Sequence, residues 1–454
     1  MTRKKLFGIV VLAALFALSS PVAAEMLTLE SAVSIALENN RSLAAAGLEA
    51  QGAGYGQAKS ISGYLPKVYF NSSVTRMDPD TFDRMEQSDE RQRQFFESMG
   101  IDTSQMEPSV FETTYQSSVQ VRQPIFNGGK EIVGIQSATV QKRQKRFAEE
   151  DVHASTANDV KKAFFEAQKA AALERTQQEA VALAQETLKL TKARFEVGQV
   201  SRAEVLRWES QAASAEGGLI QAKNGVRLAR LNLNGVMGVE LDRAWEYPEI
   251  VMELDAASLA KGQEIGAMPP AKSEDIAAHP SMKNVDASLD LSKTARNYEV
   301  TNVLPNLNFI YNYAWEDNDT LELDGDDGWT ATVALELPLF QSLGGAFGIA
   351  QAHRNLLAAQ KRQDDARRGF IQRMNAAQLN MASAIQRVEA ARKNLSFAEE
   401  TYKIVQSRLE LGAASNIDLL DAQANYISAK SGLVDAVADF RIAESEWDYL
   451  TAPQ

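Results

Sequence analysis

The stretch Ala193-Arg-Phe-Glu-Val-Gly-Gln-Val-Ser201 occurs a second time, 214 residues later, as Ser407-Arg-Leu-Glu-Leu-Gly-Ala-Ala-Ser415. In both copies the glycine lies between two stretches whose apolar residues are spaced three and four positions apart. A glycine followed three residues later by a serine fits a helix C-cap and then the N-cap of a returning helix. The chain is therefore predicted to contain two antiparallel helical hairpins, which turn at Gly198 and Gly412.

The helical spacing continues far on both sides of each turn, and alanine occupies many positions of the apolar seam. A sustained three-four spacing is typical of a coiled coil, and alanine lets the helix backbones approach closely. Long stretches around both turns also lack proline. We predict long helices at about 129–197 and 201–237 in the first copy, and at about 344–411 and 415–450 in the second. The first of these would be about 100 Å long.

Four shorter stretches alternate between apolar and polar residues, and are predicted strands at about 64–76, 113–124, 305–316 and 328–338. One face of the third stretch carries Leu307, Phe309, Tyr311, Tyr313 and Trp315. Such alternation over about ten residues, with aromatic residues on one face, is typical of transmembrane β-strands. Four strands cannot close a barrel, and an open sheet edge is not stable in lipid. The pattern therefore favours a barrel shared between subunits, with twelve strands from three chains.

The two copies differ by one insertion in the region of the strands. The paired prolines are 58 residues apart in the first copy (Pro66 and Pro124) and 33 apart in the second (Pro305 and Pro338). The first copy thus contains 25 additional residues. We assign them to a long, charged hairpin loop, Arg76–Thr114.

The two copies define the organisation of the chain. Residues 25–237 form the first repeat and residues 273–452 the second. Residues 238–272, with three prolines, form a periplasmic linker that breaks the helical pattern. Residues 1–24 have a basic start, an apolar run and small residues before Ala24, and are predicted to be a secretory signal peptide cleaved after Ala24. The alternative, a membrane anchor, is disfavoured because the apolar run is too short.

The composition excludes several classes of function. The 454 residues include no cysteine and three histidines, which excludes disulfides, thiolate metal sites and cysteine nucleophiles. The 47 Lys and Arg against 60 Asp and Glu give a net charge of −13, which argues against nucleic acid as a partner. No catalytic constellation is present, so we predict that the protein is not an enzyme and has no cofactor or resident metal.

Three minor motifs have simple structural interpretations. Asn127–Lys130 lacks the spacing of a phosphate-binding loop and fits a turn from strand to helix. His153 and His353 lie singly in predicted helices and fit surface or packing positions. The acidic run Asp324–Asp327 lacks the spacing of an EF-hand loop. A solvated hairpin turn is the interpretation for this run, with weak calcium binding as the alternative.

The order of these features, found twice, resembles the TolC-like outer-membrane efflux protein family. The resemblance rests on the signal peptide, the opening Leu27–Asn40, both Leu-Pro strand starts, both strand exits and both glycine turns. It implies an α+β membrane protein that forms a homotrimer in the outer membrane of a Gram-negative bacterium. A twelve-stranded β-barrel would continue into a periplasmic α-helical barrel. The resemblance further implies a periplasmic adaptor and an inner-membrane transporter as partners, and the export of drugs, metals or, as in type I secretion, proteins.

The resemblance also points to a gate at the second glycine turn. Family members narrow the tunnel with aspartate rings just after this turn, and Asp418 and Asp421 match those positions. Three residues apart, both side chains lie on one helical face, and a trimer would form two rings that attract cations. The alternative is that these acids only stabilise the start of the helix. The first copy has Glu204 and Arg207 instead.

Other features limit or compete with this interpretation. Some family members lock the closed tip with a Tyr and an Arg, but the matching residues here are Leu409 and Ala414. The competing hypotheses for the whole chain are a structural or adhesive coiled-coil stalk and a periplasmic enzyme or binding protein. The stalk would need a passenger region for which the loops are too short. An enzyme or binding protein would need a compact core and a polar site. The coiled-coil helices and the membrane-type strands leave no part of the chain that could form them.

Overall fold

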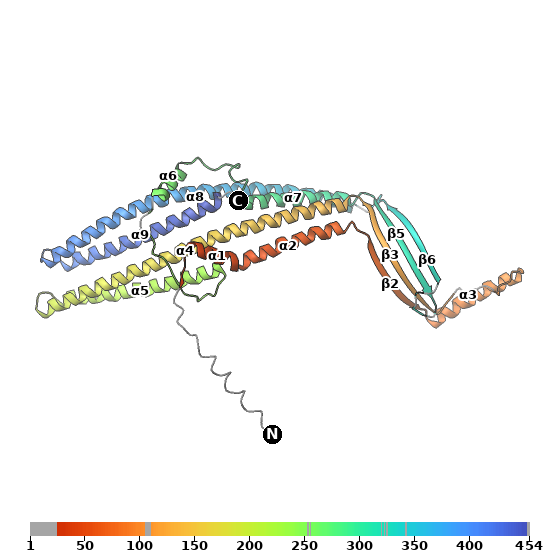
Figure 1. Ribbon diagram of the computed structural model, residues 1–454, viewed down its shortest axis with the longest axis horizontal. Coiled ribbons are helices and arrows are strands. Elements are labelled where there is room, and N and C mark those ends of the chain that lie inside the picture. The colour runs from red at the N-terminus through yellow and green to blue at the C-terminus, as the bar shows by residue number, and fades with distance from the viewer. Residues whose placement is uncertain are drawn as a thin grey trace, which may run out of the picture. The chain divides into compact units, whose positions relative to one another are not determined.

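The computed structural model describes residues 25–104, 110–251, 254, 256–318, 320–321, 323, 326–340 and 343–451. The predicted signal peptide and its cleavage site lie outside these residues, as does Asp324 of the acidic run. The described chain contains helices and strands in the order predicted for two repeats (Figure 1). The first repeat comprises β1 (Glu25–Met26), α1 (Leu29–Asn39), α2 (Arg41–Ser62), β2 (Lys67–Arg76), α3 (Pro79–Ser98), β3 (Thr113–Asn127), α4 (Lys130–Glu196) and α5 (Arg202–Met237). The linker and second repeat comprise β4 (Trp245–Glu246), α6 (Ala256–Ala267), α7 (Pro280–Thr301), β5 (Asn306–Asp317), β6 (Asp326–Glu336), α8 (Gly344–Glu410) and α9 (Asn416–Thr451).

The chain divides into two compact units, and each unit takes segments from both repeats. One unit combines Met1–Ala50, Lys145–Val285 and Asp364–Gln454. The other combines Gln51–Gln144 and Asp286–Gln363. The repeats of the sequence are therefore not separate compact bodies.

An antiparallel sheet with the strand order β2-β3-β5-β6 lies in the second unit (Figure 1). Its central pair, β3 and β5, joins the two repeats from Tyr115 opposite Asp317 to Asn127 opposite Asn306. The register shifts between Pro124 and Phe126, so β3 continues past the proline to Asn127. A bulge accommodates the proline, which has no N–H for the ladder.

One face of this sheet exposes apolar side chains in the single chain. Phe70 is opposite Val119, which is opposite Tyr313, which is opposite Trp329, so all four side chains share this face. Phe70 is 61% exposed and Trp329 is 63% exposed. Among the described residues, no further strand pairs with the outer edge of β2 or of β6. The sheet of one chain therefore lacks partners both along its two edges and on its apolar face.

The insertion of the first repeat is not the plain hairpin loop that the sequence analysis assigned to Arg76–Thr114. It contains the 20-residue helix α3. Asp78 caps this helix by accepting a hydrogen bond from the Thr81 N–H at 3.1 Å, and Pro79 occupies its first turn. Proline at this position has the helical φ angle already and loses no intrahelical hydrogen bond. The loop expectation was wrong because the charged residues of the insertion were taken as solvated loop.

The long helices of the first unit pack in pairs through small apolar residues. In the α4–α5 hairpin, Ala184 is fully buried against Ala212 and Ala215. In the α8–α9 hairpin a larger cluster surrounds Met381, Val437 and Phe440, which are almost completely buried. The linker also contributes to this core, through Leu254 and Ile265.

The linker between the repeats is more regular than its prolines suggested. Residues 256–267 form α6, which packs on α8 and α9, and β4 pairs in parallel with β1. Two glycines, Gly262 and Gly266, allow α6 to approach α8 closely, because a Cβ on either would lie within about 3 Å of Ile385 or Ala382. The expectation that the whole linker breaks the helical pattern was therefore wrong for this segment.

None of the helices in the described ranges is both long enough and apolar enough to span a membrane.

Candidate functional site

The two glycine turns have the same backbone geometry. Gly198 connects α4 to α5 and Gly412 connects α8 to α9, each with φ of +74°. The residue after each glycine donates a backbone hydrogen bond across the turn, from Gln199 to Arg194 at 2.8 Å and from Ala413 to Arg408 at 2.7 Å. Glycine adopts this left-handed conformation without the steric cost of a Cβ. Both helices can therefore end sharply and reverse.

Asp418 takes part in a reciprocal cap at the start of α9. Its Oδ2 accepts hydrogen bonds from the Ser415 backbone N–H at 2.9 Å and from the Ser415 Oγ at 2.8 Å. The Asp418 N–H in turn donates to Ser415 Oγ at 3.2 Å. The hydrogen bonds from Ser415 lower the pKa of Asp418, so its carboxylate is ionised at neutral pH. Asp418 thus stabilises the start of α9, which is the alternative role considered in the sequence analysis. This does not exclude a second role of its charge at a gate.

Asp421 lies one turn further along the same helix face, and both aspartates are exposed in the single chain. In the described part of the chain, no hydrogen bond or ion pair engages the Asp421 carboxylate. Its charge therefore projects from the end of the hairpin without neutralisation, and it differs in this respect from Asp418.

The matching turn of the first repeat faces the second turn closely. Asn416, the first residue of α9, donates a side-chain hydrogen bond to the Glu204 carboxylate of α5. Residues of both turns, including Arg194, Glu204, Arg207 and Asn416, line a cavity of about 500 Å³. The contact joins residues 212 positions apart, and nothing in the local sequence pattern signals it. Sequence reasoning therefore missed it.

The packing behind the turns explains the position of Leu409. Its side chain is 8% exposed and packs with Trp208 and Leu419, while Ala414 contacts the same cluster. Leu409 therefore belongs to an apolar cluster that links the ends of the two hairpins, where some family members have a tyrosine.

A second link between the hairpins lies further from the turns. Tyr426 of α9 donates a hydrogen bond to Glu179 of α4 at 3.0 Å, and Lys430 forms an ion pair with the same carboxylate. Burial would lower the pKa of Lys430, but the hydrogen bond from Lys430 to Glu179 raises it overall. The ammonium group is therefore charged at neutral pH, and the pair joins α4 to α9.

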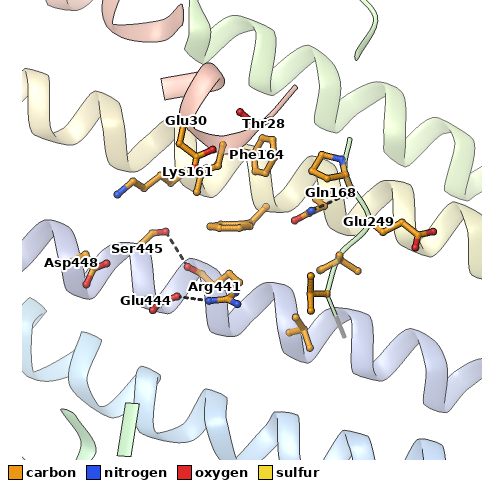
Figure 2. A pocket seen from close by; sticks show the side chains of 16 residues that line it. Thr28, Glu30, Lys161, Phe164, Gln168, Glu249, Arg441, Glu444, Ser445 and Asp448 are labelled. Atoms are coloured by element: carbon orange, nitrogen blue, oxygen red, sulfur yellow. Dashed lines mark hydrogen bonds and ion pairs between the residues drawn. The ribbon is translucent and has the colours of Figure 1, made fainter. Parts of the chain in front are cut away.

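A separate cavity of about 430 Å³ lies between α1, α4, the linker and α9 (Figure 2). Phe164 contributes an apolar wall, and Gln168 donates a hydrogen bond to the Pro248 carbonyl at 2.9 Å. On the opposite side, Arg441 pairs with Glu444 at 3.0 Å. The charged groups of α9 here are largely engaged with one another and with the linker.

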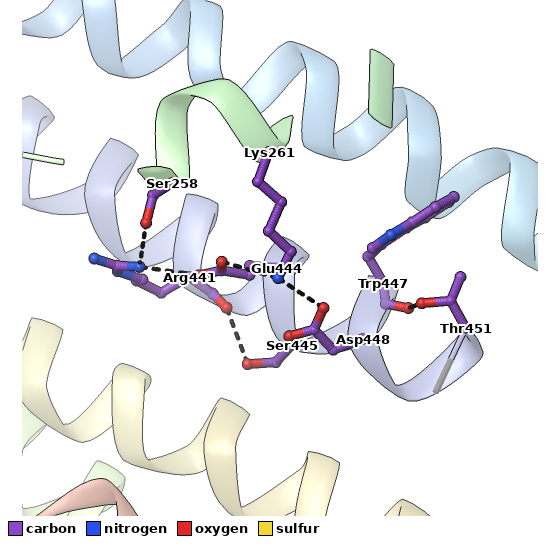
Figure 3. Close-up of polar contacts among 8 residues, drawn as sticks. All are labelled: Ser258, Lys261, Arg441, Glu444, Ser445, Trp447, Asp448 and Thr451. Atoms are coloured by element: carbon purple, nitrogen blue, oxygen red, sulfur yellow. Dashed lines mark hydrogen bonds and ion pairs between the residues drawn. The ribbon is translucent and has the colours of Figure 1, made fainter. Parts of the chain in front are cut away.

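The contacts of α9 with the linker helix explain this engagement (Figure 3). Lys261 of α6 reaches Glu444 at 3.2 Å and Asp448 at 2.8 Å, and Arg441 donates to Ser258 at 3.1 Å. These side chains join α6 to α9. Their polar groups are used in ion pairs and hydrogen bonds between the two helices, which is a structural role and not a catalytic one.

The Asn127–Lys130 turn and the two histidines lie where the sequence analysis put them. Asn127 ends β3 and Lys130 begins α4, and the two glycines between them have positive φ. His153 and His353 are exposed on α4 and α8. Within the described ranges, no three His, Cys, Asp or Glu side chains form a group that could hold a metal ion. Because part of the acidic run is not described, calcium binding there stays untested.

Comparison with known families decides the classification of the chain. The sequence model of the outer membrane efflux protein family matches residues 32–239 and 273–446, and so covers both repeats. The chain belongs to the outer membrane efflux protein family. Among curated protein sequences, none matches this chain.

Solved structures of outer-membrane channels share the fold of this efflux protein. The CmeC outer membrane channel of Campylobacter jejuni aligns with a TM-score of 0.79 at 16% identity, over 94% of this chain and 85% of that chain. The outer membrane protein VceC of Vibrio cholerae aligns with a TM-score of 0.76 at 14% identity, over 94% and 96%. The open state of the MtrE outer membrane channel of Neisseria gonorrhoeae aligns with a TM-score of 0.73 at 17% identity, over 93% and 88%.

Family membership confirms the fold class and the general function predicted from the sequence. The chain is a subunit of an outer-membrane efflux channel of a Gram-negative bacterium, its helical part lies in the periplasm, and it is a passive conduit rather than an enzyme. The alternative of a structural or adhesive stalk receives no support from any of these similarities.

Proposed function

We propose that three copies of this efflux protein form one exit duct, in which a twelve-stranded barrel continues into a tunnel of long helices. Channels of the family are homotrimeric and work with an adaptor and an inner-membrane pump. The observation that carries the proposal is the open sheet, with four strands per chain and both outer edges unpaired among the described residues. A sheet edge in lipid must be paired, and joining three such sheets leaves no edge.

The exposed apolar face of the sheet supports the same assembly. Val68 and Phe70 on β2 and Val333 and Leu335 on β6 are all more than half exposed in the single chain. Burying such a face against hydrocarbon is favourable, whereas leaving it in water is costly. Lipid of the outer membrane is therefore the proposed surrounding of this face.

The duct would be narrowed at the periplasmic end by the aspartates that follow Gly412. In a trimer, Asp418 and Asp421 each contribute a ring of three carboxylates, which attracts cations and repels anions. Because Asp418 is engaged with Ser415 through one oxygen, the unengaged Asp421 would provide the stronger field. In the proposed trimer, the turns at Gly198 and Gly412 would lie at the tip of the tunnel.

A passive duct needs partners that supply energy and select the cargo. A periplasmic adaptor would contact the helical part of the trimer, and an inner-membrane transporter would drive export. The cargo would be small molecules such as drugs or metals, or secreted proteins, according to the transporter that the duct serves.

Single-channel recording in a planar bilayer tests the duct and its gate together. Purified trimers should show a small, cation-selective conductance. Asp421→Asn should raise the conductance and reduce the selectivity for cations, because the neutral amide has similar size but no charge. Asp418→Asn should have a smaller effect on selectivity, and Asp418→Ala should also loosen the start of α9, because it removes the acceptor of the Ser415 backbone N–H.

The controls separate the channel from its gate. Asp439→Asn, on the same helix but away from the turn, should leave conductance and selectivity unchanged. If neither Asp418→Asn nor Asp421→Asn changes the conductance, the protein is still a duct, but its narrowest point is not formed by these aspartates. Trimers that insert into the bilayer and pass no current would contradict the duct itself.

A further inference from the structure

The inserted helix α3 is strongly amphipathic. At 100° per residue, its three phenylalanines and Met85, together with Met99 just beyond its end, lie within an arc of about 140°. Eight of its nine charged residues lie outside this arc. The exception is Asp89, which pairs with Arg93 at 3.2 Å. An apolar stripe of this kind normally packs against a partner.

The described chain covers little of this stripe, although Phe82 and Phe96 are each partly covered. No residue of α3 is buried, and Met85, Phe95 and Met99 are 46%, 59% and 55% exposed. The helix is nevertheless held at both ends, by the Asp78 cap and by a hydrogen bond from Thr103 to Glu97 at 2.5 Å. Within the described residues, most of the stripe is therefore accessible to a partner.

The place of α3 in the fold puts it at the boundary between copies. Only Met77 and Asp78 separate it from β2, the edge strand of the sheet. The Met77 N–H donates to the Glu112 carbonyl at 2.9 Å, which closes the base of the insertion. If the edge of β2 pairs with the next copy, as proposed above, then α3 begins next to that interface.

The charge of α3 favours a protein partner over a lipid surface. The helix has six acidic residues, three arginines and no lysine. Helices that lie on membranes are typically rich in Lys and Arg on the polar face, because lipid headgroups are often anionic. An acidic helix gains no such attraction from headgroups, whereas between copies almost all of its charges lie outside the stripe, where water and salt screen their repulsion.

The spacing of the stripe favours helices of the same kind as partners. Phe82, Met85, Asp89, Gln92 and Phe96 follow a three-four spacing, which continues to Met99. This is the seam of a short coiled coil with apolar ends and a polar middle, and polar seam residues set register and the number of strands. We propose that the three α3 helices of a trimer pack against one another along this stripe, at the end of the shared sheet where β2 leads into the insertion.

Cysteine cross-linking tests this proposal directly, because the natural chain has no cysteine. Met85→Cys and Phe96→Cys place a thiol on the stripe. Asp83→Cys and Gln94→Cys, each two residues earlier, place one on the opposite face and serve as matched controls. A disulfide forms only when the two Cα atoms lie about 4.4–6.8 Å apart. Mild oxidation of detergent-solubilised trimers should give disulfide-linked dimers with the two stripe variants and none with the controls.

The same samples distinguish this proposal from the trimer on which it rests. The mass of the unoxidised complex is measured first. A chain that is not trimeric contradicts the proposed function, whereas trimers without cross-links at either stripe position overturn only the α3 contact. Equal cross-linking at stripe and control positions would also overturn it, because random collision would then account for the bonds. Faster labelling of stripe cysteines by a membrane-dissolved maleimide, without cross-links, would assign the stripe to lipid and overturn it too.

Discussion

His279 shows how a single buried side chain couples stability to pH. His279 is 5% exposed, its ring lies tilted against Phe370 and edge-on to Tyr449, and it caps the start of α7. Nδ1 accepts a hydrogen bond from the Ser281 N–H at 3.2 Å, so the proton is on Nε2, which donates to the Tyr449 carbonyl at 3.2 Å. Both nitrogens are satisfied only in the neutral form. Burial accordingly lowers the pKa of His279, although the hydrogen bond to the Tyr449 carbonyl and the nearby Asp151 oppose this shift.

We expect His279 to make the protein less stable below neutral pH. The unfolded chain takes up a proton near pH 6.5, whereas the folded chain does so only at lower pH because the pKa of His279 is lowered. The contribution of the neutral His279 ring to the free energy of unfolding is complete above about pH 6.5. It is lost as the pH falls below this value, by up to about 1.4 kcal/mol per pH unit. Thermal unfolding measured from pH 7.5 to 5.5 should show a steeper loss for the natural protein than for His279→Asn.

The asparagine variant keeps an oxygen that can accept the Ser281 N–H, but it does not titrate. Only the change of Tm with pH is compared between the two proteins, so a lower Tm of the variant at pH 7.5 does not affect the result. His353→Asn is the matched control, since His353 is exposed on α8. Equal slopes in the natural protein and in His279→Asn would show that the ring does not carry this pH dependence.

At the scale of elements, the contact between the two turns should hold the hairpin ends together. Asn416→Ala removes the hydrogen bond to Glu204, and Asn416→Asp replaces it with a repulsion between two carboxylates. A hydrogen bond to a charged group contributes about 1.5–3 kcal/mol, and less when it is partly exposed. Planar-bilayer conductance should therefore rise with Asn416→Ala and rise further with Asn416→Asp. Glu204→Gln, which retains an acceptor oxygen, should behave nearly as the natural protein, and unchanged conductance in both Asn416 variants would contradict the idea.

The linker helix α6 depends on close contact with α8. A Cβ on Gly262 would lie 2.0 Å from Ile385 Cδ1, so Gly262→Ala forces a buried side chain to move. We expect a loss of about 1–3 kcal/mol from overpacking, seen as a lower Tm and faster tryptic cleavage within residues 238–272. Gln263→Ala, on the exposed side of the same helix, should change neither quantity. Adding Ile385→Val, which removes the Cδ1 atom, should recover most of the lost stability. If the double variant is no more stable than Gly262→Ala alone, a clash with Ile385 is not the cause of the lower Tm.

The elements themselves differ in how well the sequence reveals them. The long helices were predictable because their three-four spacing runs without proline for more than 60 residues, and α4 extends from Lys130 to Glu196. The strands were predictable from their alternation. In contrast, α3 was missed because charged residues dominate it, and α6 was missed because glycines and nearby prolines masked it. Its glycines serve packing on α8, which becomes visible only when residues distant in sequence are brought together.

The candidate site was predictable only in part, for the same reason. The turns at Gly198 and Gly412 follow from local backbone preference, and the cap at Ser415 follows from the residue type before the helix. The bond from Asn416 to Glu204 depends on how the two hairpins meet, which no local pattern contains. The gate role of Asp418 and Asp421 came from family resemblance and stays a prediction.

At the scale of the whole molecule, the two repeats are joined rather than separate. Each compact unit contains segments of both. In one unit, β3 of the first repeat pairs with β5 of the second over most of their length. In the other unit, Glu446 of α9 accepts hydrogen bonds from Asn158 and Lys162 of α4 and from Arg373 of α8. Cutting the linker should therefore leave these contacts intact.

We predict that the chain can be expressed as two halves that assemble. Residues 1–251 and residues 252–454, the latter behind a copy of the signal peptide, should co-purify from outer membranes in equal amounts and conduct as the intact trimer does. Either half alone should be degraded, because it would expose a second sheet edge and the apolar residues that now pack on the other repeat. The measurement is affinity purification through a tag on one half, followed by bilayer recording. A first half that accumulates and inserts by itself would show that the repeats fold independently, despite the sheet and ion pairs that they share.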